Sequence, residues 1–427
     1  MRHLPIFIVS MVFAACSCTS HREYKLEQVI IANRHNVRAP LQKNIDSMNQ
    51  SVGNSSIWIE WPNRNGELTP RGAVLEKSFG EYFKQYFQDN NFTDCIQSPD
   101  NVYFAASPRQ RTVKSAELFA EGLGLTVEVV NSGRTEGEDR CFLPLLNDSL
   151  AGFDTLKFQK EAKREMLEVL ASKKEKLTEA YLLLEDLVDY SCSERAKEGK
   201  IPHLSPTDTC IRFLFYKNNK KEEPAAYGDL KAANCLSDAL ILQFYEGSNE
   251  DFTPLGLTEN DTDKWRLLAE IKDCYSDILF SAPIVAVNVS HGFLDNMYKL
   301  MCSGKRLVVL CTHDTTLAAL FVALQLEPFD IPAQNSIESV TPVGVNFVIE
   351  KYDCEGEKFA KLKLVYQTSD QIRNMAPLSP DNPPAIIELS LKGLTKADGY
   401  YRWKDLENRI QETLAAFAKT AKGEKPF

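Results

Sequence analysis

Two arginines flank a single histidine near the N-terminus of the chain, in the run 34–40 (RHNVRAP). Guanidinium groups hold phosphoryl oxygens through paired, charge-assisted hydrogen bonds. Their positive charge also lowers the pKa of a neighbouring histidine, so its ring stays a free base in mild acid. The run therefore predicts a phosphate site in which Arg34 and Arg38 hold the oxygens and His35 attacks phosphorus. The competing interpretation is a polar turn with a capping role, and this run alone does not decide between the two.

Two further segments carry residues that could act on a phosphate bound at the run 34–40. His313 is followed directly by Asp314, and an aspartic acid beside a bound phosphate can protonate the leaving oxygen and later activate water. Such general acid–base help is worth about 10²–10⁴ in rate. Asp314 also suits the cap of a following helix. The third basic residue, Arg111, lies at the start of a predicted helix whose dipole favours an anion; the alternative is an exposed surface arginine.

Each of these segments follows an apolar run that predicts a strand. The runs are 26–33 (LEQVIIAN), 102–107 (VYFAAS) and 307–312 (LVVLCT). Predicted helices follow the second and third, at about 109–123 and 316–324. Strand-then-helix units favour a mostly parallel sheet with helices on its faces. Because ligands bind at the carboxyl ends of such strands, we expect the three segments to meet at one edge of the sheet.

The middle of the chain has a different composition. From 153 to 276 it is rich in Lys, Glu, Leu and Ala with helical periodicity, as in 158–184 and 234–245. We expect a mainly helical cap there, inserted into an α/β domain formed by residues 24–152 and 277–427.

The C-terminal part predicts a hairpin and a helix. Two alternating segments, 344–352 and 359–367, are separated by a polar turn. We expect them to form an antiparallel hairpin at the edge of the sheet. A final helix is expected over 403–422.

Residues 1–18 resemble an export leader. Arg2 gives a positive start, an apolar run follows over 4–15, and small residues precede Cys16. The apolar run is too short to span a membrane. The letters FAAC ending at Cys16 resemble a bacterial lipoprotein cleavage box, in which Cys16 becomes the lipid-bearing N-terminus; the alternative is ordinary cleavage near Cys16 or Cys18. We expect an exported bacterial protein, periplasmic or an outer-membrane or cell-surface lipoprotein with a lipid anchor.

Composition narrows the class of protein further. The chain has 427 residues, of which 44% are hydrophobic and 25% charged, which argues against disorder. The formal net charge of -10 gives no basic face for nucleic acid, although a local arginine cluster can still attract an anion. Nine cysteines follow the leader, with no Cys-x-x-Cys spacing, which argues against a zinc site. Cys192 and Cys210 are the pair that we expect to form a local bridge. The oligomeric state is left open.

Taken together, the motifs resemble the histidine acid phosphatase family, in clade 2 of the histidine phosphatase superfamily. The resemblance covers nearly the whole chain after the leader. It rests first on Arg-His-x-x-Arg-x-Pro at 34–40, with His-Asp far downstream at 313–314. Further matching segments follow in order: Leu68-Thr69 with Gly72, Arg111-Thr112, 236–239, 243–247, Thr341-Pro342, Tyr366-Gln367 and 371–374.

The resemblance implies a fold, a mechanism and a set of site residues. The fold is an α/β sheet with flanking helices, like those of phosphoglycerate mutases and acid phosphatases, plus a smaller helical cap. His35 would become phosphohistidine and Asp314 would be the general acid. The phosphate-holding group would be Arg34, Arg38, Arg111 and His313. No cofactor or metal is implied, since the arginines take the place of a metal.

Within the family, the subgroup of periplasmic glucose-1-phosphatases is the most similar. Asn36 stands where phytase-type members usually carry glycine, and Glu246 matches a cap residue that narrows the pocket in this subgroup. A carboxylate there disfavours inositol hexakisphosphate through like-charge repulsion. The alternative for Glu246 is a solvated charge at a helix end.

The expected activity is hydrolysis of small phosphomonoesters, such as glucose 1-phosphate, at acidic pH through phosphohistidine. Two alternatives stay open: a phytase with the same centre, and a surface-binding lipoprotein without turnover.

Overall fold

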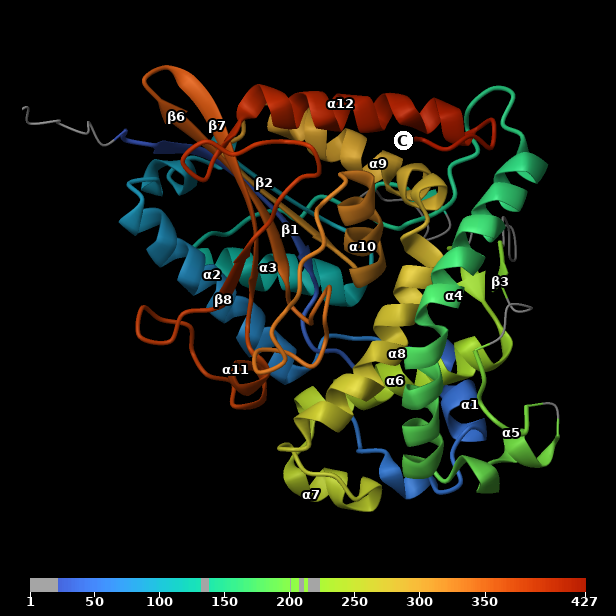
Figure 1. Ribbon diagram of the computed structural model, residues 1–427. Coiled ribbons are helices and arrows are strands. Elements are labelled where there is room, and N and C mark those ends of the chain that lie inside the picture. The colour runs from blue at the N-terminus through green and yellow to red at the C-terminus, as the bar shows by residue number, and fades with distance from the viewer. Residues whose placement is uncertain (1–21, 132–137, 200, 207–210, 214–222) are drawn as a thin grey trace, which may run out of the picture.

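The computed structural model describes residues 22–427 except 132–137, 200, 207–210 and 214–222 (Figure 1). The leader with Cys16 and Cys18 lies outside the described residues, as does Cys210 of the predicted bridge. Cys192 is an exposed free thiol. Within the described part, no single helix has the length and hydropathy of a membrane span, and one pair passes that test only together across an 88° bend.

A mixed sheet of seven strands forms the centre of the larger part of the molecule. Its order is β2-β5-β1-β6-β7-β8, with β9 also paired to β7. The first three strands are parallel and the others antiparallel. The expected fold class, a sheet with a parallel core and flanking helices, is confirmed. The strands are β1 (Lys25–Arg34), β2 (Val102–Ala106), β5 (Leu307–Thr312), β6 (Asn346–Cys354), β7 (Glu357–Tyr366), β8 (Ala385–Glu388) and β9 (Tyr401–Arg402).

The predicted hairpin forms as β6 and β7 but does not lie at the edge of the sheet. β6 pairs with β1, and β8 and β9 extend the sheet beyond β7. The position predicted for the hairpin was therefore wrong. β9 has only two residues, which is too short to give a strand signal in the sequence, and β8 has four, the shortest length that can give one.

Helices cover both faces of the sheet (Figure 1). Side chains of β1 alternate between the faces, as a strand requires. Val29 and Ile31 pack in the core with α2 (Pro70–Asp89) and α3 (Gln110–Leu123), whereas Ile30 and Ala32 pack in a second core on the opposite face. That face is covered by α9 (Pro283–Met301), α10 (Asp314–Ala323) and α12 (Trp403–Thr420). Burial on both faces explains why the middle of β1, residues 29–32 (VIIA), is continuously apolar.

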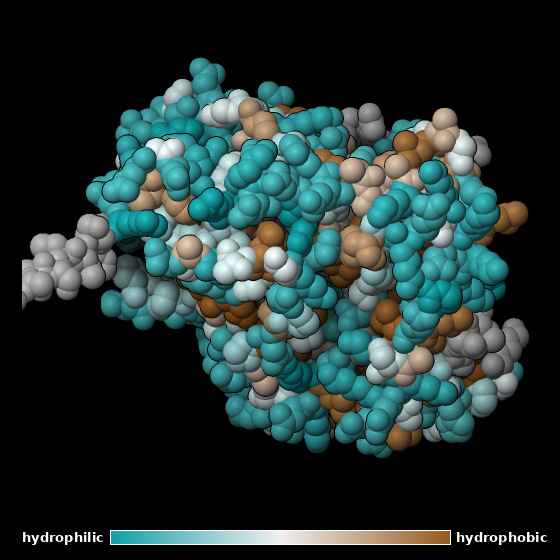
Figure 2. Space-filling view, turned by 45° about the horizontal axis from the view of Figure 1, so that its top comes forward, coloured by the Kyte–Doolittle hydropathy of each residue, from teal (hydrophilic) through white to brown (hydrophobic). Residues whose placement is uncertain are grey.

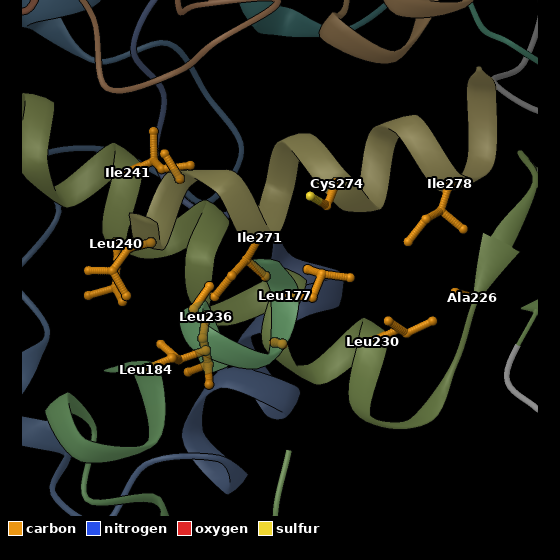
Figure 3. Packing of buried hydrophobic residues seen from close by; sticks show 14 of the residues in the cluster. Leu177, Leu184, Ala226, Leu230, Leu236, Leu240, Ile241, Ile271, Cys274 and Ile278 are labelled. Atoms are coloured by element: carbon orange, nitrogen blue, oxygen red, sulfur yellow. The ribbon is translucent and has the colours of Figure 1, made fainter. Parts of the chain in front are cut away.

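A helical part lies beside the sheet. Its main helices are α4 (Thr155–Leu187), α6 (Gly228–Glu246) and α8 (Thr262–Phe280), so the helices predicted at 158–184 and 234–245 are confirmed. Figure 3 shows their shared core, with Leu184 from α4, Leu236 from α6 and Ile271 from α8. The smaller elements are α1 (Gln42–Gln50), which packs on α6, α5 (Glu194–Lys197), β3 (Ile211–Arg212), β4 (Ala225–Ala226), α7 (Asn249–Phe252) and, on the sheet side, α11 (Ser369–Arg373).

The face of the molecule drawn in Figure 2 is mainly polar. On this face, hydrophilic side chains dominate and apolar ones occur in small scattered groups. Exposed large apolar residues such as Leu156 and Leu182 lie on α4, and scattered exposure of this kind is normal for a folded protein.

Candidate active site

The two histidines of the predicted site follow neighbouring parallel strands. Arg34 at the end of β1 is in register with Thr312 at the end of β5, so His35 and His313 leave the sheet side by side. The backbone N–H of His35 donates to the Thr312 carbonyl at 3.3 Å. The ring centroids of His35 and His313 are 5.5 Å apart, with the ring planes at 69°. The carboxyl edge of the sheet thus brings together residues that are 278 positions apart in the sequence.

His35 has one ring nitrogen fixed and the other free to react. Its Nδ1 is 2.9 Å from the Asn36 carbonyl oxygen, which can only accept a hydrogen bond. Nδ1 therefore carries the proton, and Nε2 keeps its lone pair. Burial, together with the charges of Arg111 and His313, holds the pKa of His35 well below 6.5. The ring is consequently a neutral base in mild acid.

Carboxylates orient the two arginines of the run 34–40. Nη1 of Arg34 donates to Glu338 Oε1 at 2.7 Å and also to the Thr341 carbonyl. Nη2 of Arg38 donates to both carboxylate oxygens of Asp238, at 3.2 and 3.0 Å. Burial opposes the charge of Arg34, but Glu338 and then Asp314 outweigh it and hold the pKa of Arg34 above its ordinary value. Both guanidinium groups are therefore buried, each against a carboxylate.

Arg111 reaches the site from the first turn of α3. It is 8% exposed, so the alternative of an exposed surface arginine is wrong. Its Nη2 is 3.4 Å from His313 Nδ1, and Nη1 donates to the Gly66 carbonyl at 3.2 Å. Because a guanidinium can only donate, His313 accepts at Nδ1 and offers its Nε2–H to Ser107 Oγ, 3.1 Å away. Burial and then Arg111 hold the pKa of His313 well below 6.5.

The three arginines share an unused donor. Within the described part of the chain, the buried Nε of Arg34, Arg38 and Arg111 has no hydrogen-bond partner. Buried polar groups in folded proteins are nearly always hydrogen-bonded. Burial, then Arg38 and Arg109, lower the pKa of Arg111 to about 9. A bound anion would accept hydrogen bonds from unpartnered donors and would stabilise the positive charge of Arg111.

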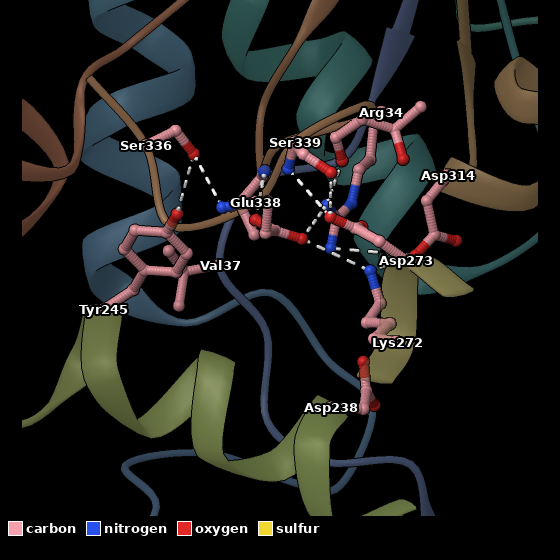
Figure 4. A network of polar contacts seen from close by, with 12 residues as sticks. Arg34, Val37, Asp238, Tyr245, Lys272, Asp273, Asp314, Ser336, Glu338 and Ser339 are labelled. Atoms are coloured by element: carbon pink, nitrogen blue, oxygen red, sulfur yellow. Dashed lines mark hydrogen bonds and ion pairs between the residues drawn. The ribbon is translucent and has the colours of Figure 1, made fainter. Parts of the chain in front are cut away.

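Asp314 begins α10, two residues earlier than predicted. Its Oδ1 accepts from the Thr315 backbone N–H at 2.9 Å. The cap position of α10 is His313 and no described side chain caps this helix, so the alternative of a capping role for Asp314 is wrong. Its Oδ2 is 2.8 Å from Lys272 Nζ and 3.7 Å from Arg34 Nη2. Figure 4 shows these groups around Glu338. Burial favours the neutral acid, but Lys272 and then Arg34 outweigh it and hold the pKa of Asp314 well below its ordinary value.

Three charged residues of this network were missed from the sequence: Lys272, Asp238 and Glu338. Asp238 lies 200 residues from its partner Arg38, and Glu338 lies 304 residues from Arg34. Such pairs leave no local spacing pattern. Asp238 does lie within the segment 236–239 that carried the family resemblance, and this match was the one available signal in the sequence.

Asn36 and Glu246 occupy different surroundings. The Asn36 amide is buried and accepts from the Val37 N–H at 2.9 Å, while its Nδ2 is 3.5 Å from Gln367 Oε1. Glu246 accepts from the Thr69 hydroxyl at 2.9 Å and lies 3.7 Å from Arg71, with its side chain 13% exposed. Burial raises its pKa against the effect of Thr69. The alternative of a solvated helix-end charge for Glu246 is therefore wrong.

Comparison with protein families and curated proteins gives consistent matches. The model of the histidine phosphatase superfamily (branch 2) matches residues 25–367. The glucose-1-phosphatase of Salmonella typhimurium is 32% identical over 409 residues, covering 93% of this chain and 94% of that protein. The glucose-1-phosphatase of Providencia rettgeri is 28% identical with the same coverage. Phytase AppA of Escherichia coli is 27% identical and covers 88% of each chain.

Solved structures share the fold. The phytase of Citrobacter braakii superposes with a TM-score of 0.75 at 24% identity, covering 91% of this chain and 98% of that one. The phytase of Hafnia alvei in complex with myo-inositol hexakis sulphate gives a TM-score of 0.75 at 20% identity, with 91% and 97% coverage. At this identity the likeness concerns the fold alone.

Proposed function

This chain belongs to branch 2 of the histidine phosphatase superfamily, and we propose that His35 is its nucleophile and Asp314 its proton donor. It is an acid phosphatase with a small phosphorylated substrate. The observation that carries the residue assignment is the position of His35. Its neutral ring, with Nε2 unprotonated, lies in the field of three buried arginines, each of which has a buried Nε without a partner in the described part of the chain.

In the first step, Arg34, Arg38, Arg111 and His313 hold the phosphoryl group, and the His313 ring also contacts the guanidinium of Arg111. Nε2 of His35 forms a bond to phosphorus while the bond from phosphorus to the ester oxygen breaks. Asp314 delivers a proton to that oxygen, and the alcohol leaves. The protein contributes positioning and neutralisation of charge on the phosphoryl oxygens.

In the second step, water attacks phosphorus, Asp314 takes a proton from the water, and the bond to His35 breaks. Inorganic phosphate and the neutral imidazole result. Lys272 and Arg34 favour the carboxylate form of Asp314, but the first step needs it protonated. A phosphoryl group brings negative charge beside it and competes for Arg34, and both effects favour the protonated acid. Low pH supplies that proton, which accounts for an acid phosphatase.

We propose small sugar phosphates, such as glucose 1-phosphate, as the substrates. The curated glucose-1-phosphatases support this choice, and Glu246 places a carboxylate next to Thr69, whose backbone N–H donates to Val37 in the run 34–40. We assign Glu246 and Asn36 to specificity. The related phytase makes inositol polyphosphates the second candidate class.

The test is a comparison of kcat/KM for glucose 1-phosphate and phytate at pH 4 to 7, with and without a chelator. We expect the sugar phosphate to be preferred at acidic pH and the chelator to have no effect. Glu246→Gln should raise the relative rate on phytate, whereas Glu259→Gln, an exposed carboxylate paired with Arg373, is the matched control. Preference for phytate by the wild type would favour the second class. Binding without turnover of any ester would contradict the enzyme assignment.

Export and anchoring remain proposals. The leader pattern over residues 1–18 supports export, and Cys16 is the residue that we propose carries lipid. Residues 153–276 are our proposed bounds for the helical cap.

A further inference from the structure

Lys272 is a buried cation that the mechanism above does not use. It lies on α8, in the helical part of the molecule, and is 8% exposed. Its Nζ is 2.8 Å from Asp314 Oδ2 and 3.2 Å from Glu338 Oε1. Glu338 also binds Arg34, and Arg34 lies 3.7 Å from Asp314. The four side chains therefore form a closed ring of alternating charge (Figure 4).

The contacts of Asp314 explain why Lys272 matters. Oδ1 accepts from the Thr315 N–H, and Oδ2 is the oxygen that faces both cations, Lys272 and Arg34. Lys272 is closer to Oδ2 than Arg34 is. An ammonium at hydrogen-bond distance stabilises the carboxylate against the acid.

We propose that Lys272 is a positioning residue that holds Asp314 in place as a carboxylate and thereby sets the pH above which the enzyme loses its proton donor. The inference rests on the proposed function, because it concerns the acid of that same reaction. Lys272 is itself held by Glu338 and does not need to touch substrate.

Other charges act on Asp314 from every side, and among those named here Lys272 is the cation that comes from the helical part. Arg34 and Arg111 favour the carboxylate, whereas Asp238 and Glu223 oppose it. The neighbouring rings are those of His35 and His313. Burial raises the pKa of Asp314, and Lys272 is the group that lowers it most. This agrees with the distances from Oδ2, which are shorter to Lys272 than to Arg34.

The experiment is a set of kcat–pH profiles for glucose 1-phosphate and 4-nitrophenyl phosphate. In Lys272→Met, Asp314 should keep its proton to higher pH. The fall in kcat at high pH with glucose 1-phosphate should therefore move upward by at least about one pH unit, since a close opposite charge shifts a carboxyl by about 1–3 units. The shift should be smaller for 4-nitrophenyl phosphate, whose leaving group needs little help from an acid.

Controls separate this role from simple loss of structure. Lys272→Arg keeps the charge and should keep the wild-type profile. Lys173→Met removes a different lysine that pairs with α8, through Asp277 at 2.8 Å, and should leave the profile unchanged. If Lys272→Met does not fold, Lys272→Gln replaces it with the same expected shift.

An unchanged or lowered high-pH limb in folded Lys272→Met or Lys272→Gln would overturn the inference while leaving the phosphatase assignment intact. Absence of phosphomonoester turnover in the wild type would instead overturn the proposed function.

Discussion

The charged groups of the site differ in how fully the protein neutralises them. Arg34, Arg38 and Lys272 each have a carboxylate within 3.2 Å, whereas Arg111 contacts a carbonyl and a histidine. Its lowered pKa, about 9, reflects burial followed by repulsion from Arg38 and Arg109. Arg111 is thus the residue that gains most from a bound phosphoryl group. Arg34 and Arg38 are already neutralised by carboxylates, which fix the positions of their guanidinium groups.

The loss of rate on removing the acid at Asp314 should be larger for esters whose leaving group is poorer. In Asp314→Asn we expect kcat for glucose 1-phosphate to fall by about 10²–10⁴, the usual value of general acid–base catalysis. The burst of 4-nitrophenol from 4-nitrophenyl phosphate should persist, because that step needs little acid, while the later steady-state rate falls. Rapid mixing and single-turnover assays measure both phases. Equal losses on the two substrates in the burst phase would contradict the role of Asp314 as an acid.

At the scale of elements, the N-terminus of α2 supports the run that contains His35. The Thr69 N–H donates to the Val37 carbonyl at 3.0 Å, and the Thr69 hydroxyl accepts from the Gly72 N–H. A Cβ at Gly72 would lie 2.3 Å from the Val37 carbonyl oxygen. The helix can approach this closely only because position 72 has no side chain.

Gly72→Ala should therefore impair activity more than stability. We expect the loop to move, with a loss of up to about 10²-fold in kcat/KM, which a displacement near 1 Å can cause. The matched control is Gly122→Ala, whose Cβ would lie 2.2 Å from the Lys77 carbonyl at the α2–α3 contact. Both variants should lose stability by about 1–3 kcal/mol. Assays well below both melting temperatures should show low activity for Gly72→Ala only, and equal activities would count against this explanation.

How much the sequence predicts differs between elements. β1, β5 and α3 were predicted closely because buried apolar runs and helical periodicity are local signals. β8 was not, because its four residues are alternately half-buried and exposed. The residues His35, Arg111 and His313 were predicted to meet because each follows a strand of the parallel core. Lys272 and Glu338 were not, since each pairs with a partner far away in sequence and lies in no recognisable motif.

At the scale of the whole molecule, the site forms where the helical part meets the sheet. The sheet side supplies His35, Arg111 and His313, and the helical part supplies Asp238 and Lys272. Beneath this junction lies Glu76 on α2, fully buried, which accepts from the Asn33 amide at 2.8 Å. Burial raises the pKa of Glu76 to about 8. This carboxyl is therefore neutral under acidic assay conditions.

The raised pKa of Glu76 should make the free energy of unfolding depend on pH. Its folded pKa is raised, so the folded state binds more protons than the unfolded state between 4.5 and about 8. The stability that the neutral acid contributes is present at low pH and is lost as pH rises through that window, by about 1.4 kcal/mol per unit. Glu76→Gln, which cannot ionise, should match the wild type near pH 4.5 and exceed it increasingly up to pH 8. Urea unfolding at several pH values measures this, and a constant difference would contradict it.

The central claim is that His35 accepts the phosphoryl group, and trapping the intermediate tests it most directly. Enzyme mixed with labelled glucose 1-phosphate and quenched with base within milliseconds should carry phosphate that is stable in base and labile in acid. Peptide mass spectrometry should place it on residue 35, and His35→Ala should carry none and show no turnover. Label on another side chain, or turnover by His35→Ala, would contradict the account.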